Sequence, residues 1–489
     1  MKVAALKQYL QQRLVIILLV SYFVLHGVVI NAGTVSLRSG INLLLLQLAC
    51  SLFLYELCLR IYRTPSKAAL ASFVVITGIL FFGVFQDMVA GFKPIADLGR
   101  LVVFFPLVLL VTGISLLYLY YTKKRFIRLH RYLTYLLIIY MLIDVVKGLR
   151  STSFTSPVLV SGKPGYVGPR PDIYLVLLDE YLGHEGLQSY FNYPNSNFRN
   201  FLQTEGFYQV KRPVSNYSLT VYSIGSLLNM KLFEGIGDPV ISNHYAYKTA
   251  LEKIENNRVC SLFSGLGYAI RNKSPFYLSG QAPAYSQNLL PQRLDLLQHQ
   301  TMYYRVAAAL PDFLGAMGND YFILRKRRRT GESNERMMQE VLEEANLKSG
   351  QPRFTYMHLM MPHDPFLRDS LGGETKNFRE SEWTQSVKDD AYLQYLVYTN
   401  NTIAAFLRKL NRITKGDAVI LLMSDHGSRH VASDKLQLGH NTINSVYVPG
   451  SDSASWYDGL SNVNAFPVLF KELFGLRLSL QRDSIVTPD

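Results

Sequence analysis

Cysteine is scarce in this sequence, with 3 residues among 489. Cys50 and Cys58 lie in one long apolar segment, and Cys260 stands alone in the remainder of the chain. A stabilising disulfide framework is therefore excluded for that remainder, because it offers no two cysteines that could pair. A cysteine-based metal site and a thiol nucleophile are disfavoured for the same reason.

Acidic residues are also few, since 36 Asp and Glu stand against 50 Lys and Arg, for a net charge of +14. The excess lies near the start of the chain. Residues 1–150 hold 16 Lys and Arg and only four acids, so the other residues carry a net charge of about +2. Basic residues that flank apolar segments indicate membrane topology, whereas a nucleic-acid-binding protein would carry them over its globular part. We expect no nucleic-acid partner.

Long stretches without charge fill residues 1–150 and have the length of membrane-spanning helices. Further apolar segments follow the first one at once, so it is not read as a cleaved signal peptide. We predict a five-helix transmembrane domain over 1–150, with spans at 14–32, 41–59, 68–86, 101–121 and 132–143.

The basic residues are unevenly distributed between the loops of these spans. They cluster before the first span, after the second and after the fourth, and the alternate loops hold few. The positive-inside rule then places the N-terminus in the cytoplasm and, after five crossings, the chain beyond Arg150 outside. We expect a multi-pass membrane protein with a large extracytoplasmic domain.

Residues 151–170 are rich in Ser, Pro and Gly and predict a linker. Beyond the linker, strand-like and helix-like patterns alternate, which predicts one α/β domain over 171–489 with a doubly wound, mostly parallel sheet. Predicted strands cover 172–178, 353–360, 418–423 and 443–448. Predicted helices cover 197–205, 251–266, 334–347 and 392–410.

The segment 290–329 has a different pattern, because it is amphipathic and aromatic and closes with a basic run at 325–329. Such a helix can lie on anionic headgroups. A solvated run of charge at the end of a helix explains the same residues, and both interpretations stay open.

Polar side chains follow the apolar runs at the points where the predicted strands end. Asp179 follows the first strand, and Asp425 and His426 follow the run at 418–423. The carboxyl ends of parallel strands meet at one edge of a sheet, where ligands bind. Carboxylate oxygens and an imidazole nitrogen at that edge can hold one divalent cation. A helix N-cap at Asp179 and an exposed turn after Met423 are the structural alternatives.

Hydroxyl side chains precede and enter an apolar helical pattern between residues 215 and 230. A hydroxyl at a helix N-terminus can serve as its cap. The same position suits a nucleophile, because the helix dipole favours an alkoxide and a bound phosphoryl group, and a metal lowers the hydroxyl pKa further. We choose Ser218 as the nucleophile, with Thr220 as the fallback.

Histidines complete the candidate site. In the motif MPHDPF, His363 follows a strand and can hold an oxyanion or give a proton to a leaving group. His440 precedes the last predicted strand, and Arg429 and His430 follow the Asp–His pair closely enough to face the same pocket. His358 lies inside a strand and is interpreted as a core histidine.

The order of these motifs resembles that of the alkaline phosphatase/sulfatase superfamily: LDE after a strand, a hydroxyl-rich helix start, MPHDPF, SDHG and a later histidine. With five preceding spans, the chain is most similar to membrane-anchored phosphoethanolamine transferases and to phosphoglycerol transferases such as lipoteichoic acid synthases. The resemblance implies a divalent metal, Zn²⁺ as first choice and Mn²⁺ as second, held by Asp179, Ser218, Asp425 and His426. It also implies that His363 and His440 hold phosphoryl oxygens or a second metal.

Two departures from the family pattern concern the nucleophile. Transferases of this kind usually carry Thr there, whereas our first choice is Ser218. Sulfatases that form formylglycine need a Cys or Ser followed by Pro and Arg, and the residues after Ser218 are Leu-Thr-Val-Tyr. Sulfate-ester hydrolysis by that route is therefore disfavoured.

The resemblance thus predicts a two-step transfer at the outer, periplasmic face of the bacterial plasma (inner) membrane. Ser218 would take a phosphoethanolamine or phosphoglycerol headgroup from a phospholipid. The resulting covalent intermediate would then pass the headgroup to an envelope glycan or lipid. His363, His440 and Arg429 would neutralise charge on the phosphoryl oxygens. The alternatives are a phosphodiesterase or phosphatase of the same superfamily and a catalytically degenerate membrane scaffold.

Overall fold

The computed structural model describes residues 2–124, 126–151, 168–233, 244–285, 290–347, 349–375, 383–429, 436–451 and 453–486. The chain divides into two compact units. The first comprises Met1–Phe154 and Asn288–Phe313, and the second comprises Thr155–Gln287 and Leu314–Asp489. Most of the predicted linker, 152–167, lies outside the described residues, as does His430.

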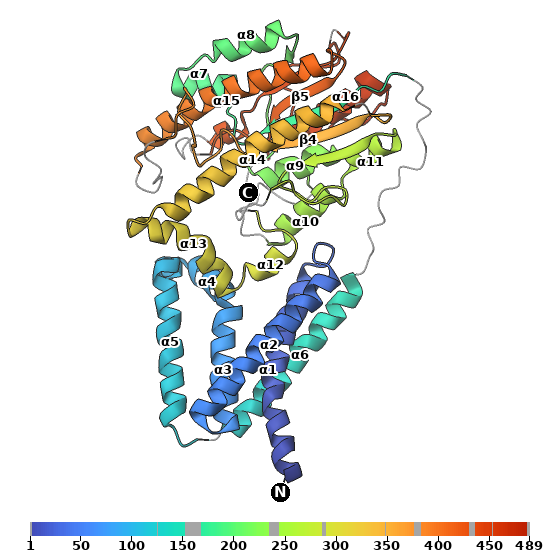
Figure 1. Ribbon diagram of the computed structural model, residues 1–489. Coiled ribbons are helices and arrows are strands. Elements are labelled where there is room, and N and C mark those ends of the chain that lie inside the picture. The colour runs from blue at the N-terminus through green and yellow to red at the C-terminus, as the bar shows by residue number, and fades with distance from the viewer. Residues whose placement is uncertain are drawn as a thin grey trace. The chain divides into compact units, whose positions relative to one another are not determined.

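The first unit is a bundle of apolar helices (Figure 1). Its helices are α1 (Lys2–Ile30), α2 (Leu37–Tyr62), α3 (Pro65–Leu80), α4 (Phe82–Gly91), α5 (Leu101–Tyr121) and α6 (Ile127–Ser151). Four of them are long and apolar enough to cross a membrane, and the pair α3 and α4 adds a fifth if counted as one span. The predicted bundle is therefore confirmed as four to five apolar helices. The third predicted span is not straight, because α3 and α4 are bent by 60° at a break after Leu80.

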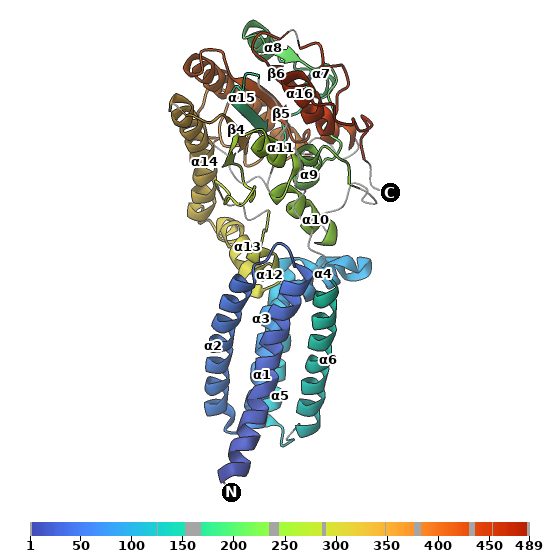
Figure 2. The ribbon, with the colours of Figure 1, turned by 90° about the vertical axis from the view of Figure 1, so that its right-hand side faces the viewer.

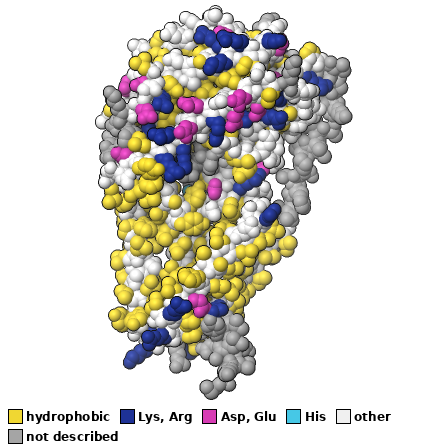
Figure 3. Space-filling model, viewed as in Figure 1, with side chains coloured by type: hydrophobic (Ala, Val, Ile, Leu, Met, Phe, Trp, Pro, Cys, Tyr) yellow, Lys and Arg dark blue, Asp and Glu magenta, His cyan; other side chains and the backbone are white. Residues whose placement is uncertain are grey.

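Burial in the bundle differs between its helices. Of the most apolar stretch of α1, 39% is buried, whereas only 6% of the corresponding stretch of α5 is buried. Large apolar side chains of α5 such as Val102 and Leu117 are more than half exposed. A face of this kind is expected against lipid, and Figure 3 shows apolar side chains over these helices.

Two acidic side chains inside the bundle have basic partners. Asp144 on α6 is buried, and its Oδ2 lies 2.9 Å from His26 Nδ1 on α1. Glu56 on α2 pairs with Arg13 on α1. Charges are costly in lipid unless they are paired, so both pairs are compatible with a membrane-spanning bundle and tie α1 to its neighbours.

A segment from the second half of the chain packs into the first unit. Its helix α12 (Leu294–Gln298) inserts Leu297 into the apolar core of the bundle. The carbonyl of Gln300 accepts a hydrogen bond of 2.8 Å from the Gly83 amide, and Arg305 at the start of α13 (Met302–Ala316) makes two bonds of 2.7 Å to Asp87. Part of the predicted membrane-facing segment 290–329 thus belongs to the bundle, whereas the prediction placed all of 171–489 in one domain.

The second unit is built on a six-stranded sheet in the order β2-β6-β5-β1-β4-β3. The strands are β1 (Ile173–Leu178), β2 (Tyr208–Gln209), β3 (Ala269–Lys273), β4 (Arg353–Leu359), β5 (Val419–Ser424) and β6 (Asn444–Tyr447). Strands β3, β4, β1 and β5 are mutually parallel, and β6 and β2 continue the sheet in antiparallel pairs. The predicted mostly parallel sheet is confirmed, with an antiparallel edge.

Helices cover both faces of this sheet (Figures 1 and 2). One face packs on α8 (Ser196–Thr204), α14 (Tyr321–Asn346) and α15 (Gln385–Ile413), which enclose alternate β1 residues such as Val176. The opposite face packs on α11 (Arg258–Gly265) and α16 (Ala465–Phe474), where Phe354 of β4 stacks on Phe263 at 4.4 Å. Since both faces of the sheet are buried, the sequences of its central strands are continuous apolar runs.

Three predicted elements differ from those observed. The predicted helix at 251–266 is two helices, α10 (His244–Glu255) and α11, because Asn257 ends the first and caps the second by accepting a 2.7 Å bond from the Cys260 amide. Helices α14 and α15 are longer than predicted. The sequence pattern missed β3, an edge strand whose residues AIRNK lack an apolar run.

The strand register brings the polar strand ends together. Leu178 of β1 pairs with Ser424 of β5 on one side and with Leu359 of β4 on the other. The residues that follow these three positions therefore emerge at one edge of the sheet. Strand β6 runs in the opposite direction, so Asn444 at its start pairs with Met423 at that same edge.

Candidate metal centre and its surroundings

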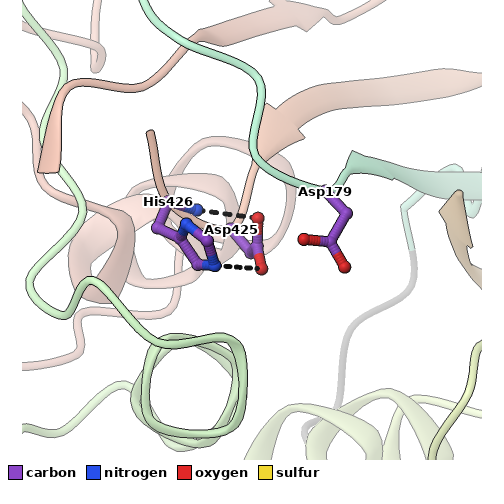
Figure 4. Close-up of side chains that lie close together, drawn as sticks. All are labelled: Asp179, Asp425 and His426. Atoms are coloured by element: carbon purple, nitrogen blue, oxygen red, sulfur yellow. Dashed lines mark hydrogen bonds and ion pairs between the residues drawn. The ribbon is translucent and has the colours of Figure 1, made fainter. Parts of the chain in front are cut away.

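Two carboxylates and one imidazole meet at the carboxyl edge of the sheet (Figure 4). Asp179, Asp425 and His426 are buried, and each offers a ligand atom within 4.8 Å of the other two. The Asp179 carboxylate points from the end of β1 toward Asp425. Asp179 Oδ1 and Asp425 Oδ2 have no hydrogen-bond partner in the described part of the chain. Buried carboxylate oxygens without donors are costly, and a divalent cation would satisfy them.

Backbone amides hold the Asp425 carboxylate in place. Its Oδ1 accepts hydrogen bonds from the Glu180 amide at 3.1 Å and from the His426 amide at 2.8 Å. The side-chain amide of Asn462 donates to the carbonyls of Ser424 and Asp425, which fixes the end of β5. One oxygen of Asp425 is thus anchored, and the other is left for a ligand.

His426 has one nitrogen engaged and one available. Its Nδ1 lies 2.7 Å from the Gly427 carbonyl, which can only accept, so Nδ1 carries the hydrogen. The lone pair is then on Nε2, which lies 3.3 Å from Asp425 Oδ2 and 3.2 Å from the hydroxyl oxygen of Thr220. A side chain at Gly427 would collide with the Leu438 carbonyl, so the turn after His426 requires glycine.

The pKa shifts in this cluster agree with a cation site. Burial, together with the nearby Arg429, lowers the pKa of His426 to about 4, so the ring is neutral and can ligate. Burial and the Asp179 charge raise the pKa of Asp425 to about 7. Burial alone would raise the pKa of Asp179, but the charge of His363 and the contact with His358 bring it below the ordinary value. A bound cation would relieve the repulsion between the two carboxylates.

Thr220 places its side-chain hydroxyl in contact with the imidazole of this cluster. It is buried, it is the first residue of α9 (Thr220–Asn229), and its Oγ1 makes the 3.2 Å contact with His426. The residue before it, Leu219, offers no side-chain cap, so the first turn of α9 presents its amide groups to this region. Ser218 lies two residues earlier, is half-buried, and packs beside Gly439.

A second polar group lies beside the first and includes Glu180, a residue that the sequence analysis did not select. Glu180, His363 and Asp364 also offer ligand atoms within 4.8 Å of one another. Glu180 is buried, and its Oε1 accepts a 2.6 Å bond from Arg429 Nε. The signal was present in the sequence, because Glu180 follows Asp179 directly at the end of β1.

His363 and Arg429 bring positive charge to the edge of the candidate metal centre. Arg429 Nη2 lies 3.4 Å from His363 Nε2, and His363 Nδ1 lies 2.7 Å from Asp364 Oδ1. Burial would lower the pKa of His363, but the carboxylates of Glu180 and Asp179 raise it well above its usual value. His363 is therefore an imidazolium that can donate a proton, next to a guanidinium that cannot.

The two remaining histidines occupy different places. His440 is buried, and its Nδ1 lies 2.9 Å from the Ser215 carbonyl, in the loop that leads to Ser218. His358 lies inside β4, as predicted, yet its Nε2 is 3.3 Å from Asp179 Oδ2 and its Nδ1 is 2.9 Å from the Tyr356 hydroxyl. His358 thus supports the orientation of Asp179 from the core side.

The sequence model of the Sulfatase family matches residues 241–467. This stretch includes His363, Asp425, His426, Arg429 and His440, and it begins after Asp179 and Thr220. The matched residues lie mostly in the second unit, since 288–313 belong to the first. This match agrees with the sulfatase part of the predicted resemblance. No curated protein matches the chain.

Several solved structures are similar to the chain at low identity. The integral membrane lipooligosaccharide phosphoethanolamine transferase A from Neisseria meningitidis is 13% identical with a TM-score of 0.42, over 93% of this chain and 94% of that one. The zinc complex of the periplasmic domain of EcEptC from Escherichia coli is 12% identical with a TM-score of 0.39, over 66% and 87%. The phosphonate monoester hydrolase of Agrobacterium radiobacter is 12% identical with a TM-score of 0.39, over 62% and 74%. None of these similarities assigns a reaction to this chain.

Proposed function

We propose that the protein is a membrane-anchored, metal-dependent phosphotransferase of the sulfatase type. It moves a phosphoryl-linked headgroup, of the phosphoethanolamine or phosphoglycerol kind, from a phospholipid to an envelope glycan or lipid. The observation that carries the proposal is the approach of the Thr220 hydroxyl to a neutral imidazole, beside two buried carboxylates with oxygens that lack donors. The bacterial inner membrane, with the sulfatase-type domain on its periplasmic side, is the location that fits this reaction.

Thr220 replaces Ser218 as the proposed nucleophile. Ser218 is the first choice from the sequence, with Thr220 as the fallback, whereas Thr220 is the residue at the helix start and in contact with His426. A hydroxyl in that position benefits from the positive end of the α9 dipole when it carries negative charge. Ser218 remains close enough to the start of α9 to contact a bound headgroup.

Asp179, Asp425 and His426 would hold a divalent cation, with Zn²⁺ the first candidate and Mn²⁺ the second. When bound, such a cation lowers the pKa of a coordinated hydroxyl and neutralises phosphoryl oxygens. The protein's own contribution is to orient these ligands. The backbone amides of Glu180 and His426 hold the Asp425 carboxylate, and the Gly427 carbonyl fixes the tautomer of His426.

In the first step, a bond forms between Thr220 Oγ1 and phosphorus, the hydroxyl proton of Thr220 passes to water, and the bond from phosphorus to the diacylglycerol oxygen breaks. His363, protonated because carboxylates surround it, gives its proton to the departing oxygen. Arg429, anchored by Glu180, places a fixed positive charge near the transferring group. In the second step, an acceptor hydroxyl attacks phosphorus and gives its proton to His363, while Thr220 Oγ1 leaves phosphorus and takes a proton from water.

The experiment that tests this proposal is mass spectrometry of the purified full-length protein after exposure to a bacterial phospholipid extract. A headgroup phosphate adduct is expected on the peptide that contains Ser218 and Thr220. It should persist in Ser218→Ala and disappear in Thr220→Val. An adduct that survives Thr220→Val overturns the nucleophile assignment, and the absence of any adduct in the metal-loaded wild type overturns the covalent mechanism.

The same intermediate would serve a hydrolase, because only the second step differs. Release of free headgroup phosphate without transfer to glycan or lipid, measured with labelled donor, would favour the phosphodiesterase. A degenerate scaffold would bind no stoichiometric metal and form no adduct. Asp179 and Asp425 each have a buried carboxylate oxygen without a hydrogen-bond donor among the described residues. Two such carboxylates facing each other destabilise a fold, so a purely structural role does not explain them and a scaffold is disfavoured.

A further inference from the structure

A cavity of about 570 Å³ lies at one end of the helical bundle, inside the first unit. Its walls are the first turn of α3, the end of α5 with the loop that follows it, and Gln12 of α1. This is the end of the bundle where basic residues gather after the second and fourth spans. By the positive-inside rule it is the cytoplasmic end.

The wall of this cavity is strongly basic. Lys67, Lys123 and Lys124 line it, and none of its described lining residues is acidic. Lys67 Nζ donates a hydrogen bond of 3.2 Å to the Tyr120 carbonyl, which holds its side chain across the opening between α3 and α5. Lys67 is half-buried and Lys123 and Lys124 are exposed, so the cavity wall carries three positive charges that favour a bound anion.

Two further features supply hydrogen-bond donors to an anion. The first turn of α3, a helix of 16 residues, lines the cavity, and its N-cap residue Thr64 makes no side-chain capping bond. A helix N-terminus of this kind binds phosphate through its amides and its dipole. Gln12 is only 7% exposed, and its Oε1 has no hydrogen-bond partner among the described residues. Since Gln12 lines the cavity, its side-chain amide can supply an NH₂ donor to the same anion.

The mouth of the cavity fits a lipid better than a soluble anion. Tyr120 and Tyr121 are 54% and 77% exposed, and Ile127 is 44% exposed. Aromatic residues at this level of a bundle are typical of the membrane interface, with acyl chains on one side and headgroups on the other. Basic pockets between spans at the cytoplasmic side bind anionic lipid headgroups.

We propose that this cavity binds the phosphate of an anionic phospholipid from the cytoplasmic leaflet. The phosphate lies between Lys67, Lys123 and Lys124, with the first turn of α3 and Gln12 as additional donors. This site does not depend on the proposed reaction, because all of its residues belong to the first unit and none contacts the candidate metal centre.

Native mass spectrometry of the full-length protein in detergent tests the proposal with phosphatidylglycerol, phosphatidylcholine and glycerol phosphate as separate probes. The wild type should retain phosphatidylglycerol in preference to phosphatidylcholine. The triple variant Lys67→Gln/Lys123→Gln/Lys124→Gln should lose affinity for phosphatidylglycerol by about 100-fold, with little change for phosphatidylcholine. The single variant Gln12→Met, which leaves the charge unchanged, should weaken phosphatidylglycerol binding by about tenfold.

The matched control is Arg60→Gln/Arg63→Gln/Arg128→Gln, which removes three charges at the same end of the bundle but outside the cavity wall. Its affinity for phosphatidylglycerol should fall by less than about threefold. An equal loss in the two triple variants would overturn the site, since charge alone would then explain binding. Glycerol phosphate bound as tightly as the lipid would overturn the assignment to a lipid.

Discussion

The hydroxyl of Thr220 lies 3.2 Å from Nε2 of His426, although 206 residues separate them in the chain. The contact exists because α9 begins at Thr220 and because β5 delivers His426 to the same edge of the sheet. It joins the proposed nucleophile to the proposed metal ligands, and it is the reason for proposing Thr220 rather than Ser218.

Substitution of Thr220 by Val keeps the size of the side chain and removes the hydroxyl. Headgroup transfer should fall by at least about 10³-fold, because no other group replaces the nucleophile. Ser218→Ala should retain activity within about tenfold of the wild type. Labelled-lipid turnover measures both, and a Thr220→Val enzyme as active as Ser218→Ala would contradict the assignment.

Substitution of Asp425 by Asn should abolish metal binding. Elemental analysis should give one equivalent in the wild type and less than about a tenth in the variant, because the remaining ligands lack the charge to hold a divalent cation. With metal at about 100 times its Kd, the wild type should gain about 2.7 kcal/mol in its free energy of unfolding, and the variant should gain none. His440→Ala serves as the control and should keep its metal, since His440 lies outside the group formed by Asp179, Asp425 and His426.

Metal affinity should rise as the pH rises through about 7. The pKa of Asp425 is raised to about 7 by burial and by Asp179, so below that value the metal-free site holds a proton that must leave when the cation enters. Isothermal titration in buffers of different ionisation enthalpy should show about one proton released at pH 6 and close to none at pH 8.5. Equal proton release at both values would contradict the protonated carboxyl.

Glu180 is predicted to act through Arg429 and His363. Glu180→Gln removes the anchor of Arg429 and one of the carboxylates that raise the pKa of His363. We expect kcat/KM to fall by about 10- to 100-fold, with metal content unchanged. Since His363 must be protonated to release the leaving group, its lower pKa should move the alkaline limb of the pH profile to lower pH. A uniform loss at all pH values would indicate only a structural role.

Much of the candidate site could be predicted from the sequence, because a parallel sheet collects its strand ends. Asp179, Asp425 and His426 each follow an apolar run, which predicts that they meet at one edge of the sheet, and the structure brings them within ligand distance of one another. His363 and Arg429 lie beside them for the same reason. Strand direction alone gives this placement, and the alternation of strands and helices predicts that direction.

Other features depend on contacts that no local pattern contains. From the sequence, the helix could begin near Ser218 or near Thr220. Only the packing of α9 beside the end of β5 brings the Thr220 side chain to His426. Glu180 adopts a positive φ of 58°, which carries its side chain to Arg429 on another strand end. The segment around Leu297 joins the helical bundle through side-chain packing against α1, far away in sequence.

The most direct test is whether Asp179, Thr220, Asp425 and His426 share one cation. It uses X-ray diffraction from crystals grown with Zn²⁺, measured on both sides of the zinc absorption edge. An anomalous peak is expected within about 2.0–2.2 Å of Asp179, Asp425 and His426 Nε2, with Thr220 Oγ1 completing the coordination. A fully loaded protein whose zinc lies elsewhere, or which shows no peak at this edge of the sheet, would contradict the proposed centre and the reaction built on it.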